Sequence, residues 1–216
     1  MSITTKVRHS TFVDELLPDG TYPALLFRLV HIGTLVETYK GTPKSYDKIL
    51  LSYEIPTHKR LFRDTEAAYV VHVEYTLSLW ETAKLRKAIV QMKGTDIFRE
   101  KDSEADYEVT DIIGTACMLT TKQRPLPNGQ AVVEIAGYAP LPDDELMPES
   151  PYPLAVLSYK EFDWKLFLSL GKHLRTKIES TPEFKAIPEE VRLNGIENAQ
   201  NPQQAEDEGY DGDLPF

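Results

Sequence analysis

The chain has 216 residues and a mass of 24.6 kDa, which is enough for one sizeable hydrophobic core. Apolar residues make up 41% of the sequence and charged residues 27%, a composition typical of a globular protein. No run approaches the roughly 18 apolar residues of a membrane helix, and the N-terminus lacks the apolar core of a signal peptide. The single cysteine, Cys117, excludes an internal disulfide and a thiolate zinc cluster. We therefore expect a soluble, cytoplasmic protein.

The net charge of −10 is distributed unevenly along the chain. Residues 196–216 contain six acidic side chains and no basic one, which leaves −4 for the remaining residues. Residues 1–63 carry a balance of +3, whereas residues 64–195 carry −7. Because the local potential guides a polyanion more than the net charge does, this distribution permits nucleic-acid binding without demonstrating it.

Five segments have the composition or the alternation of β-strands. Gly33 is expected to mark a bulge or bend after the first of them, and Pro56 is expected to end the second. His72 falls on the polar face of the third, where it offers a weak indication of nucleic-acid contact. The five strands are expected at residues 21–32, 46–55, 69–79, 112–122 and 131–139.

Two regions have helical patterns. Ser78 and Glu81 have the spacing of a capping box, which predicts a helix from there to about Met92, with Trp80 on its apolar face. Residues 158–193 carry apolar side chains at helical spacing, and we expect this segment either to pack against the strands or to mediate self-association.

The order strand, strand, strand, helix, strand, strand is the connectivity of the OB-fold barrel. Another five-stranded antiparallel sheet with one helix has the same order and remains the alternative. We predict a mainly β protein, a five-stranded OB-fold barrel with a helix between strands 3 and 4. The expected parts are an N-terminal extension (1–18), the OB-fold domain (19–140), a proline-rich acidic connector (141–157), a helical segment (158–193) and a disordered acidic tail (194–216).

Basic and aromatic side chains occupy the loops that flank the binding face of an OB barrel, expected at residues 36–45 and 122–130, and the segment between strands 2 and 3. Cations follow the phosphates of single-stranded nucleic acid, and aromatic rings stack on unpaired bases for about 1–3 kcal/mol each. The alternative is an ordinary solvated surface. The residues predicted to bind DNA are Tyr39, Lys40, Lys44, Tyr46, Lys48, Lys59, Arg60, Phe62, Arg63, Lys122 and Arg124.

Motifs for catalysis are absent from the sequence. It contains neither the GxxxxGK[ST] phosphate loop nor the GxSxG nucleophile motif, and its five histidines lack the spacing of metal ligands. We interpret the acidic clusters at 102–108 and 143–145 as solvated surface and Cys117 as a packed thiol. We therefore expect no enzymatic activity, no metal and no cofactor. A metal-dependent nuclease is the enzymatic alternative.

The last nine residues combine an acidic linker with a small apolar tip at the free carboxylate. A partner pocket can take the terminal aromatic ring, an Arg or Lys can pair with the carboxylate, and a basic rim can meet the acids. The alternative is an acidic tail that only improves solubility. The predicted partner-binding residues are Asp211, Asp213, Leu214, Pro215 and Phe216.

The tip 213–216 resembles the C-terminal tip of bacterial single-stranded DNA-binding proteins, which end in acids followed by Ile-Pro-Phe. Here Leu214 takes the Ile position, and glycines separate the acids. The body, over about residues 18–140, resembles instead the OB-fold single-stranded DNA-binding proteins of tailed bacteriophages. The segments that carry this second resemblance are 20–24, 32–34 and the Lys-rich loop leading into 46–55.

The resemblance implies sequence-independent binding of single-stranded DNA during phage replication or recombination, in the cytoplasm of an infected bacterium. The tip would recruit host or phage replication and repair proteins. It would also compete with DNA for the basic groove, because a tethered acidic tail stays at a high local concentration. Self-association on DNA is a further expectation. The alternative is an interaction protein whose tail occupies host pockets while the body binds no DNA.

Overall fold

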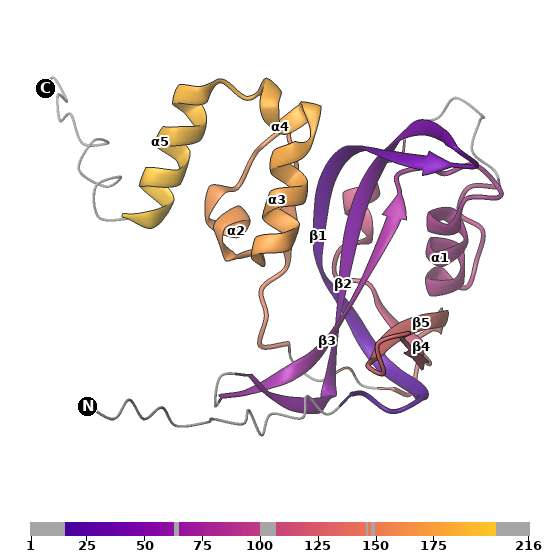
Figure 1. The fold of residues 1–216 in the computed structure, drawn as a ribbon. Helices are drawn as coiled ribbons and strands as arrows, with labels where there is room; N and C mark the ends of the chain where they lie inside the picture. The colour runs from indigo at the N-terminus through magenta and orange to yellow at the C-terminus, as the bar shows by residue number, and fades with distance from the viewer. Residues whose placement is uncertain (1–15, 63–64, 100–106, 146, 148–149, 202–216) are drawn as a thin grey trace, which may run out of the picture.

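The described residues form one β-sheet with helices on both sides, in a computed structural model that describes residues 16–62, 65–99, 107–145, 147 and 150–201 (Figure 1). The strands are β1 (Gly20–Tyr39), β2 (Thr42–Phe62), β3 (Thr65–Thr76), β4 (Ala116–Pro125), β5 (Ala131–Pro140) and β6 (Ala155–Leu157). The helices are α1 (Lys84–Lys93), a 3-10 turn η1 (Val109–Ile112), α2 (Trp164–Ser169), α3 (Lys172–Ser180), α4 (Pro182–Ala186) and α5 (Glu189–Gln200). A mainly β fold is therefore confirmed.

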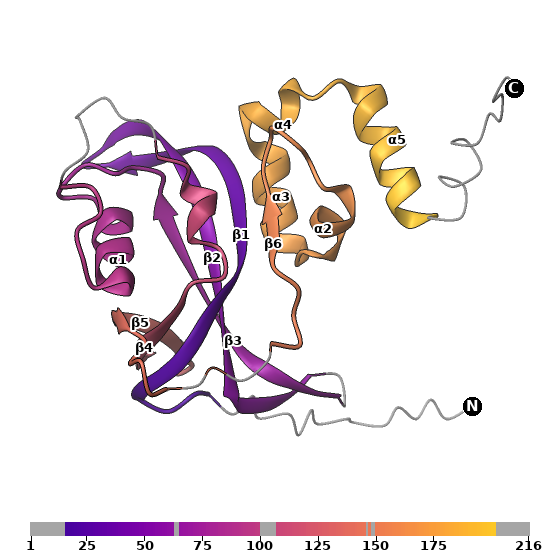
Figure 2. The ribbon, with the colours of Figure 1, turned by 180° about the vertical axis from the view of Figure 1, so that it is seen from behind.

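The strand order in the sheet is β3-β2-β1-β4-β5, with antiparallel neighbours throughout, and β6 pairs with β1 in parallel. Figure 2 shows β6 alongside β1, on the side of the sheet that carries α3. β6 lies within the segment that we expected to be a connector. Backbone pairing leaves the sheet open, since β3 and β5 are its two ends in the described residues. Side chains bridge these ends: the hydroxyls of Tyr75 and Tyr138 are 2.7 Å apart.

The strands extend further than predicted at three places. β1 and β2 stay paired up to Lys40 and Gly41, whose φ values of +49° and +81° make the tight turn of a two-residue hairpin. Pro56 interrupts the β2–β3 pairing instead of ending β2, because the ladder resumes at Lys59 after an irregularity. Correspondingly, β3 begins at Thr65, before the start that we predicted at residue 69.

The inner core lies between the curved sheet and α1. The helix buries Leu85, Ala88, Ile89 and Met92, and the Tyr53 hydroxyl donates to the Met92 sulfur at 3.3 Å. The helix ends at Gly94 in the left-handed conformation, a common helix end.

The predicted start of this helix is wrong. Ala83, not Ser78, is the N-cap, and Trp80 is 82% exposed instead of packed in the core. The backbone N–H of Leu77 donates to the Asp47 carbonyl at 2.8 Å, so the chain is still attached to β2 one residue before Ser78. The helix therefore begins later than the capping-box pattern indicates.

The outer core joins the C-terminal helices to the opposite face of the sheet. Val30 and Ile32 of β1 pack with buried side chains of the helices, among them Phe167, Ile178 and Phe184. The segment 158–193 thus packs against the strands, and its helical structure continues in α5 to Gln200. The acidic tip, residues 211–216, lies outside the described residues.

At the predicted bulge, a side chain of α4 contacts the backbone of β1. The register shifts between His31 and Gly33, and Gly33 has a φ of +100°. Next to it, the backbone N–H and the hydroxyl of Thr34 donate to the Glu183 carboxylate at 2.9 and 2.5 Å. A Cβ on Gly33 would lie 2.7 Å from Glu183 Oε2 and 3.0 Å from Thr181 Oγ1. The bulge is thus confirmed, and a glycine is needed both for its backbone angle and for this contact.

We predict that Gly33→Ala lowers the free energy of unfolding by about 1–3 kcal/mol more than Gly41→Ala does, as measured by urea denaturation. Both glycines have positive φ, so both variants carry the cost of that conformation, but a Cβ on Gly41 meets open space. Equal losses in the two variants would contradict tight packing of α4 on β1.

Candidate nucleic-acid interface

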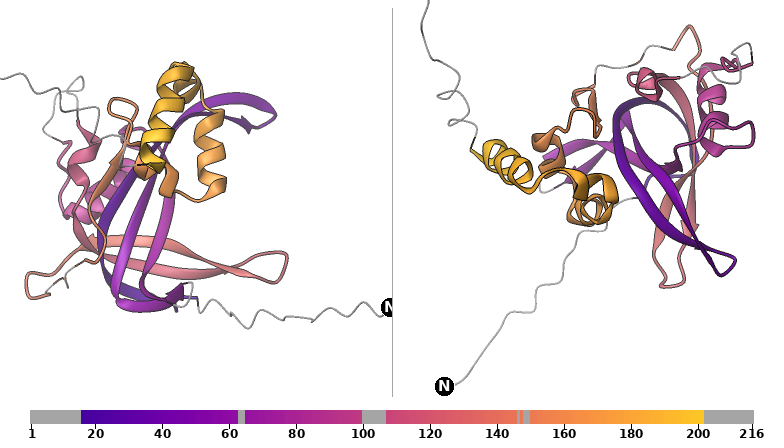
Figure 3. Two further views of the ribbon diagram at one scale, coloured as in Figure 1. Left: turned by 90° about the vertical axis from the view of Figure 1, so that its left-hand side faces the viewer. Right: turned by 90° about the horizontal axis from the view of Figure 1, so that it is seen from above.

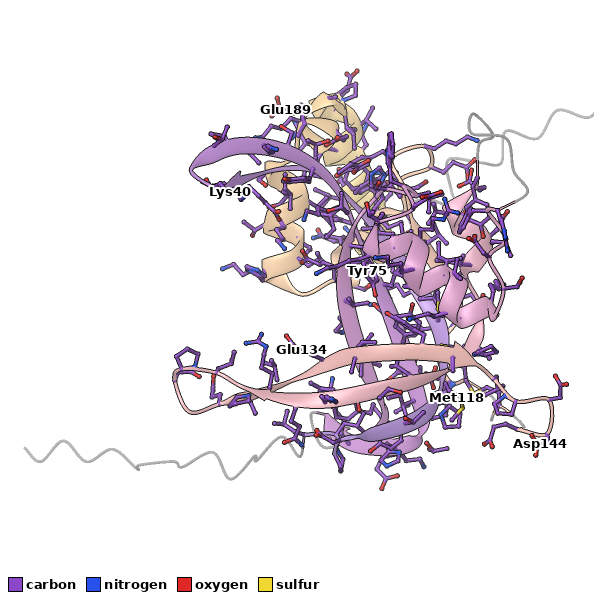
Figure 4. The ribbon with its side chains drawn as sticks, turned by 90° about the vertical axis from the view of Figure 1, so that its right-hand side faces the viewer. Lys40, Tyr75, Met118, Glu134, Asp144 and Glu189 are labelled. Carbon is purple, nitrogen blue, oxygen red and sulfur yellow. The ribbon has the colours of Figure 1, made fainter. Side chains whose placement is uncertain are left out.

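Six of the predicted DNA-binding residues lie on two hairpins, and we call them the hairpin cluster: Lys40, Lys44, Tyr46, Lys48, Lys122 and Arg124. The β1–β2 and β4–β5 hairpins project to the same side of the molecule (Figure 3). Figure 4 shows Lys40 at the tip of the first hairpin and Glu134 on the second, with Tyr75 at a level between them. The side chain of Tyr39, also predicted there, lies outside the described residues.

Carboxylates already pair with part of the hairpin cluster. Lys48 Nζ is 2.9 Å from Glu37 and lies 5.2 Å from the centre of the Tyr46 ring. Arg124 pairs with Glu134 at 2.6 Å. These ion pairs reduce the positive potential that the two hairpins offer to a phosphate chain.

The remaining predicted residues lie at the other end of β2. Lys59 is 11 residues along the strand from Lys48, which corresponds to roughly 35 Å of extended chain. It pairs with Glu66 at 3.4 Å, and the Arg60 guanidinium lies 5.4 Å from the centre of the Tyr69 ring. The side chain of Phe62 and the whole of Arg63 lie outside the described residues. The structure therefore separates the predicted residues into two groups.

A β-bulge in β1 adds further basic and aromatic side chains to the region around Arg60. Leu26 and Leu29 both belong to the inner core, although strict alternation would put residues 26 and 28 on the same face. The register shift between Leu26 and Arg28 makes Phe27 the extra residue. As a result, both Phe27 and Arg28 lie away from the inner core.

The neighbouring strands and the connector complete this group, which we call the outer-face cluster: Phe27, Arg28, Arg60, His72 and Tyr152. Arg28 pairs in register with Ser52 of β2, and Ser52 with His72 of β3. The ring of Tyr152 stacks on Phe27 with centroids 5.0 Å apart and planes 26° from parallel. The Arg28 guanidinium lies 5.1 Å from the centre of the Phe27 ring.

The outer-face cluster is electropositive. Desolvation lowers the pKa of Arg28, and among the described residues no carboxylate lies within ion-pair distance of it. Desolvation, and then the charges of Arg28 and Arg60, lower the pKa of His72 to about 4. The nearby Glu54 is buried, its pKa is raised by desolvation, and its carboxylate accepts a hydrogen bond from the Ser150 hydroxyl. The Glu54 carboxylate is therefore held by Ser150, and no described carboxylate forms an ion pair with the Arg28 guanidinium that an anion would contact.

The C-terminal helices limit how much of the outer face is open. They cover the part of the sheet around Val30, Ile32 and Leu50, and Lys177 of α3 pairs with Glu74 of β3. Figure 1 shows these helices over one end of the strands, while the end of the β2–β3 hairpin extends beyond them. The outer-face cluster belongs to the part of the sheet outside this helical packing.

The sequence prediction missed three members of the outer-face cluster and gave only a weak indication of a fourth. The three are Phe27, Arg28 and Tyr152, and the fourth is His72. Arg28 is the one cation within the largely apolar run 21–32, and Tyr152 stands between two prolines. Those two irregularities are the signals that point to the cluster.

Outside the two clusters, the described residues include a buried thiol and a cavity with a histidine in its wall. In the ranges that the structure describes, no group of three His, Cys, Asp or Glu side chains is placed to hold a metal ion. Burial raises the pKa of the Cys117 thiol to about 12, which makes it a poor nucleophile. A cavity of about 430 Å³ lies between β1, β2 and η1, and its wall includes His31, which is 2.7 Å from Asp47.

Within the described residues, no helix is both long and apolar enough to cross a bilayer.

Comparisons with known proteins identify no relative: no family model matches the chain, and no curated protein matches it.

We predict that acid weakens the fold through His72. An unfolded imidazole takes up its proton near pH 6.5, whereas His72 in the folded protein does so near pH 4, so the unfolded state binds more protons between these values. The free energy of unfolding should therefore fall as the pH drops through this range. Arg28→Gln removes one repelling charge and should raise the pKa of His72 in an NMR titration. A pKa near 6.5 in the unmutated protein, or no change in Arg28→Gln, would contradict this electrostatic description.

Proposed function

We propose that the chain is a non-enzymatic, sequence-independent single-stranded DNA-binding protein built on an OB-fold. The strand order β3-β2-β1-β4-β5, with α1 between β3 and β4, supports this fold assignment. The contact between Tyr75 and Tyr138 adds support, because it brings together the two end strands that an OB barrel would close.

The outer-face cluster is the observation that carries the proposal. It combines a cation, Arg28, with which no described carboxylate forms an ion pair, and a stack of two aromatic rings on adjacent chain segments. Single-stranded nucleic acid presents the two complementary groups: a negatively charged phosphate for the cation and an unpaired base for the rings. Stacking tolerates every base, so such a surface binds without reading the sequence.

The biological role follows from the tail. Its tip, Asp213 to Phe216, resembles the tip through which bacterial single-stranded DNA-binding proteins meet their partners. We propose that the body covers single strands during phage replication or recombination, in the cytoplasm of an infected bacterium. The tip then recruits replication and repair proteins and competes with DNA for the basic surface.

Fluorescence anisotropy of a labelled oligo-dT with the full chain tests the proposal. Binding should weaken with added salt, at a slope of about −0.7 per phosphate neutralised. A chain that ends at Gln200 keeps every described helix and strand and should bind more tightly, because it lacks the competing tail. If neither protein binds at low salt, and deletion of Phe216 abolishes capture of a partner, the chain is an interaction protein instead.

We predict that Arg28→Ala weakens oligo-dT binding about ten-fold and reduces the salt slope by about 0.7, because one phosphate contact is lost. Lys87→Ala, on the exposed side of α1, is the matched control and should bind like the unmutated protein. If Arg28→Ala binds normally while the Lys40→Ala, Lys44→Ala double variant does not, DNA follows the hairpin cluster and the outer face is not the site.

A further inference from the structure

The segment from Ser150 to Leu154 lies against the outer face of the sheet although it belongs to the connector. The Ser150 hydroxyl contacts the Glu54 carboxylate of β2 and also accepts a hydrogen bond from the Tyr152 N–H at 3.1 Å. Immediately afterwards, β6 pairs with residues 28–30 of β1. The sheet therefore holds this segment on both sides of Tyr152.

Backbone contacts and a ring stack both restrain Tyr152. One of its faces stacks on Phe27, which is 2% exposed, and Tyr152 itself is half-buried. Pro151 and Pro153 restrict the backbone on either side of it. Among the described residues, no aromatic ring other than Phe27 stacks on Tyr152. A ring that is already ordered loses little entropy when a further ring stacks on it.

The charge next to this ring suits a nucleotide. The Arg28 guanidinium lies 5.1 Å from the centre of the Phe27 ring, on which Tyr152 stacks. A base on the ring and its phosphate at the guanidinium would satisfy both groups at once. A protein ligand of acidic character would use the cation, but it would not need the flat ring.

We infer that Tyr152 is a base-stacking residue of the single-stranded DNA site. A base adds a third ring to the Phe27–Tyr152 stack, while Arg28 receives the adjoining phosphate. This inference rests on the proposed function. It extends the DNA site beyond residue 140, where we predicted the DNA-binding domain to end, and it makes the connector part of the binding surface.

Photocrosslinking of the full chain tests the inference without any mutation. A dT oligomer that carries 5-iodouracil is irradiated with the protein, and the crosslinked peptides are identified by mass spectrometry. We expect the main crosslink at Tyr152. Crosslinks confined to the hairpin cluster would overturn the inference.

Variants then measure the contribution of the ring. Tyr152→Ala should weaken oligo-dT binding about ten-fold without changing the salt slope, because a stacking ring is lost and no charge is removed. Tyr152→Phe keeps the ring and should bind normally. The control is Trp80→Ala, an equally drastic loss of an aromatic side chain at a site that is 82% exposed, and it should also bind normally. Far-UV circular dichroism and thermal unfolding establish that each variant is folded.

A base-dependent readout separates stacking from a merely structural role. The unmutated protein should prefer oligo-dT to an abasic oligomer of equal charge, and Tyr152→Ala should lose most of that preference. An unchanged preference would show that Tyr152 only supports the connector. If the unmutated protein binds no DNA, the proposed function fails together with the inference. If it binds and Tyr152→Ala binds equally well, only the inference fails. Binding of oligo-U but not oligo-dT would overturn the assignment to DNA.

Discussion

The need to bury both faces of β1 governs this structure. The strand pairs with β2, β4 and β6 and contributes to both hydrophobic cores. Leu26 and Leu29 face the inner core, so a curved sheet and α1 must enclose them. Val30 and Ile32 face the other way, and exposure of these aliphatic side chains would forfeit roughly 1.5–3 kcal/mol for each. The C-terminal helices are therefore an integral part of the fold.

The two bulges in β1 divide its outer face by chemistry. At Ile32 and Gly33 the strand accepts α4 at short distance, and the Glu183 carboxylate binds the backbone and hydroxyl of Thr34. At Phe27 the other bulge turns a ring and then a cation away from the inner core. One end of the outer face is thus apolar and covered by helices. The other end carries the positively charged side chains that we propose as DNA contacts. The proposed DNA binding depends on this division, because its site lies on the part of the outer face outside the helical packing.

The strand pattern and the order of elements could be predicted from the sequence because both follow local alternation, as in Ile49, Leu51 and Tyr53. The bulge at Phe27 could not, because a largely apolar run such as 21–32 does not reveal which residue is unpaired. The predicted start of α1 was wrong because the chain is still hydrogen-bonded to β2 at Leu77, a tertiary contact that a local capping pattern does not reveal. The site was predicted only in part, since Tyr152 reaches Phe27 across more than a hundred residues of sequence, and carboxylates such as Glu37 reach Lys48 only after folding.

Amide hydrogen exchange on the full chain, with and without saturating oligo-dT, tests most directly whether DNA occupies the outer face. We expect slower exchange at the amides of Arg28, His72, Ser150, Tyr152 and Leu154, with little change in α1. Protection confined to the β1–β2 and β4–β5 hairpin tips, or no protection anywhere, would contradict it.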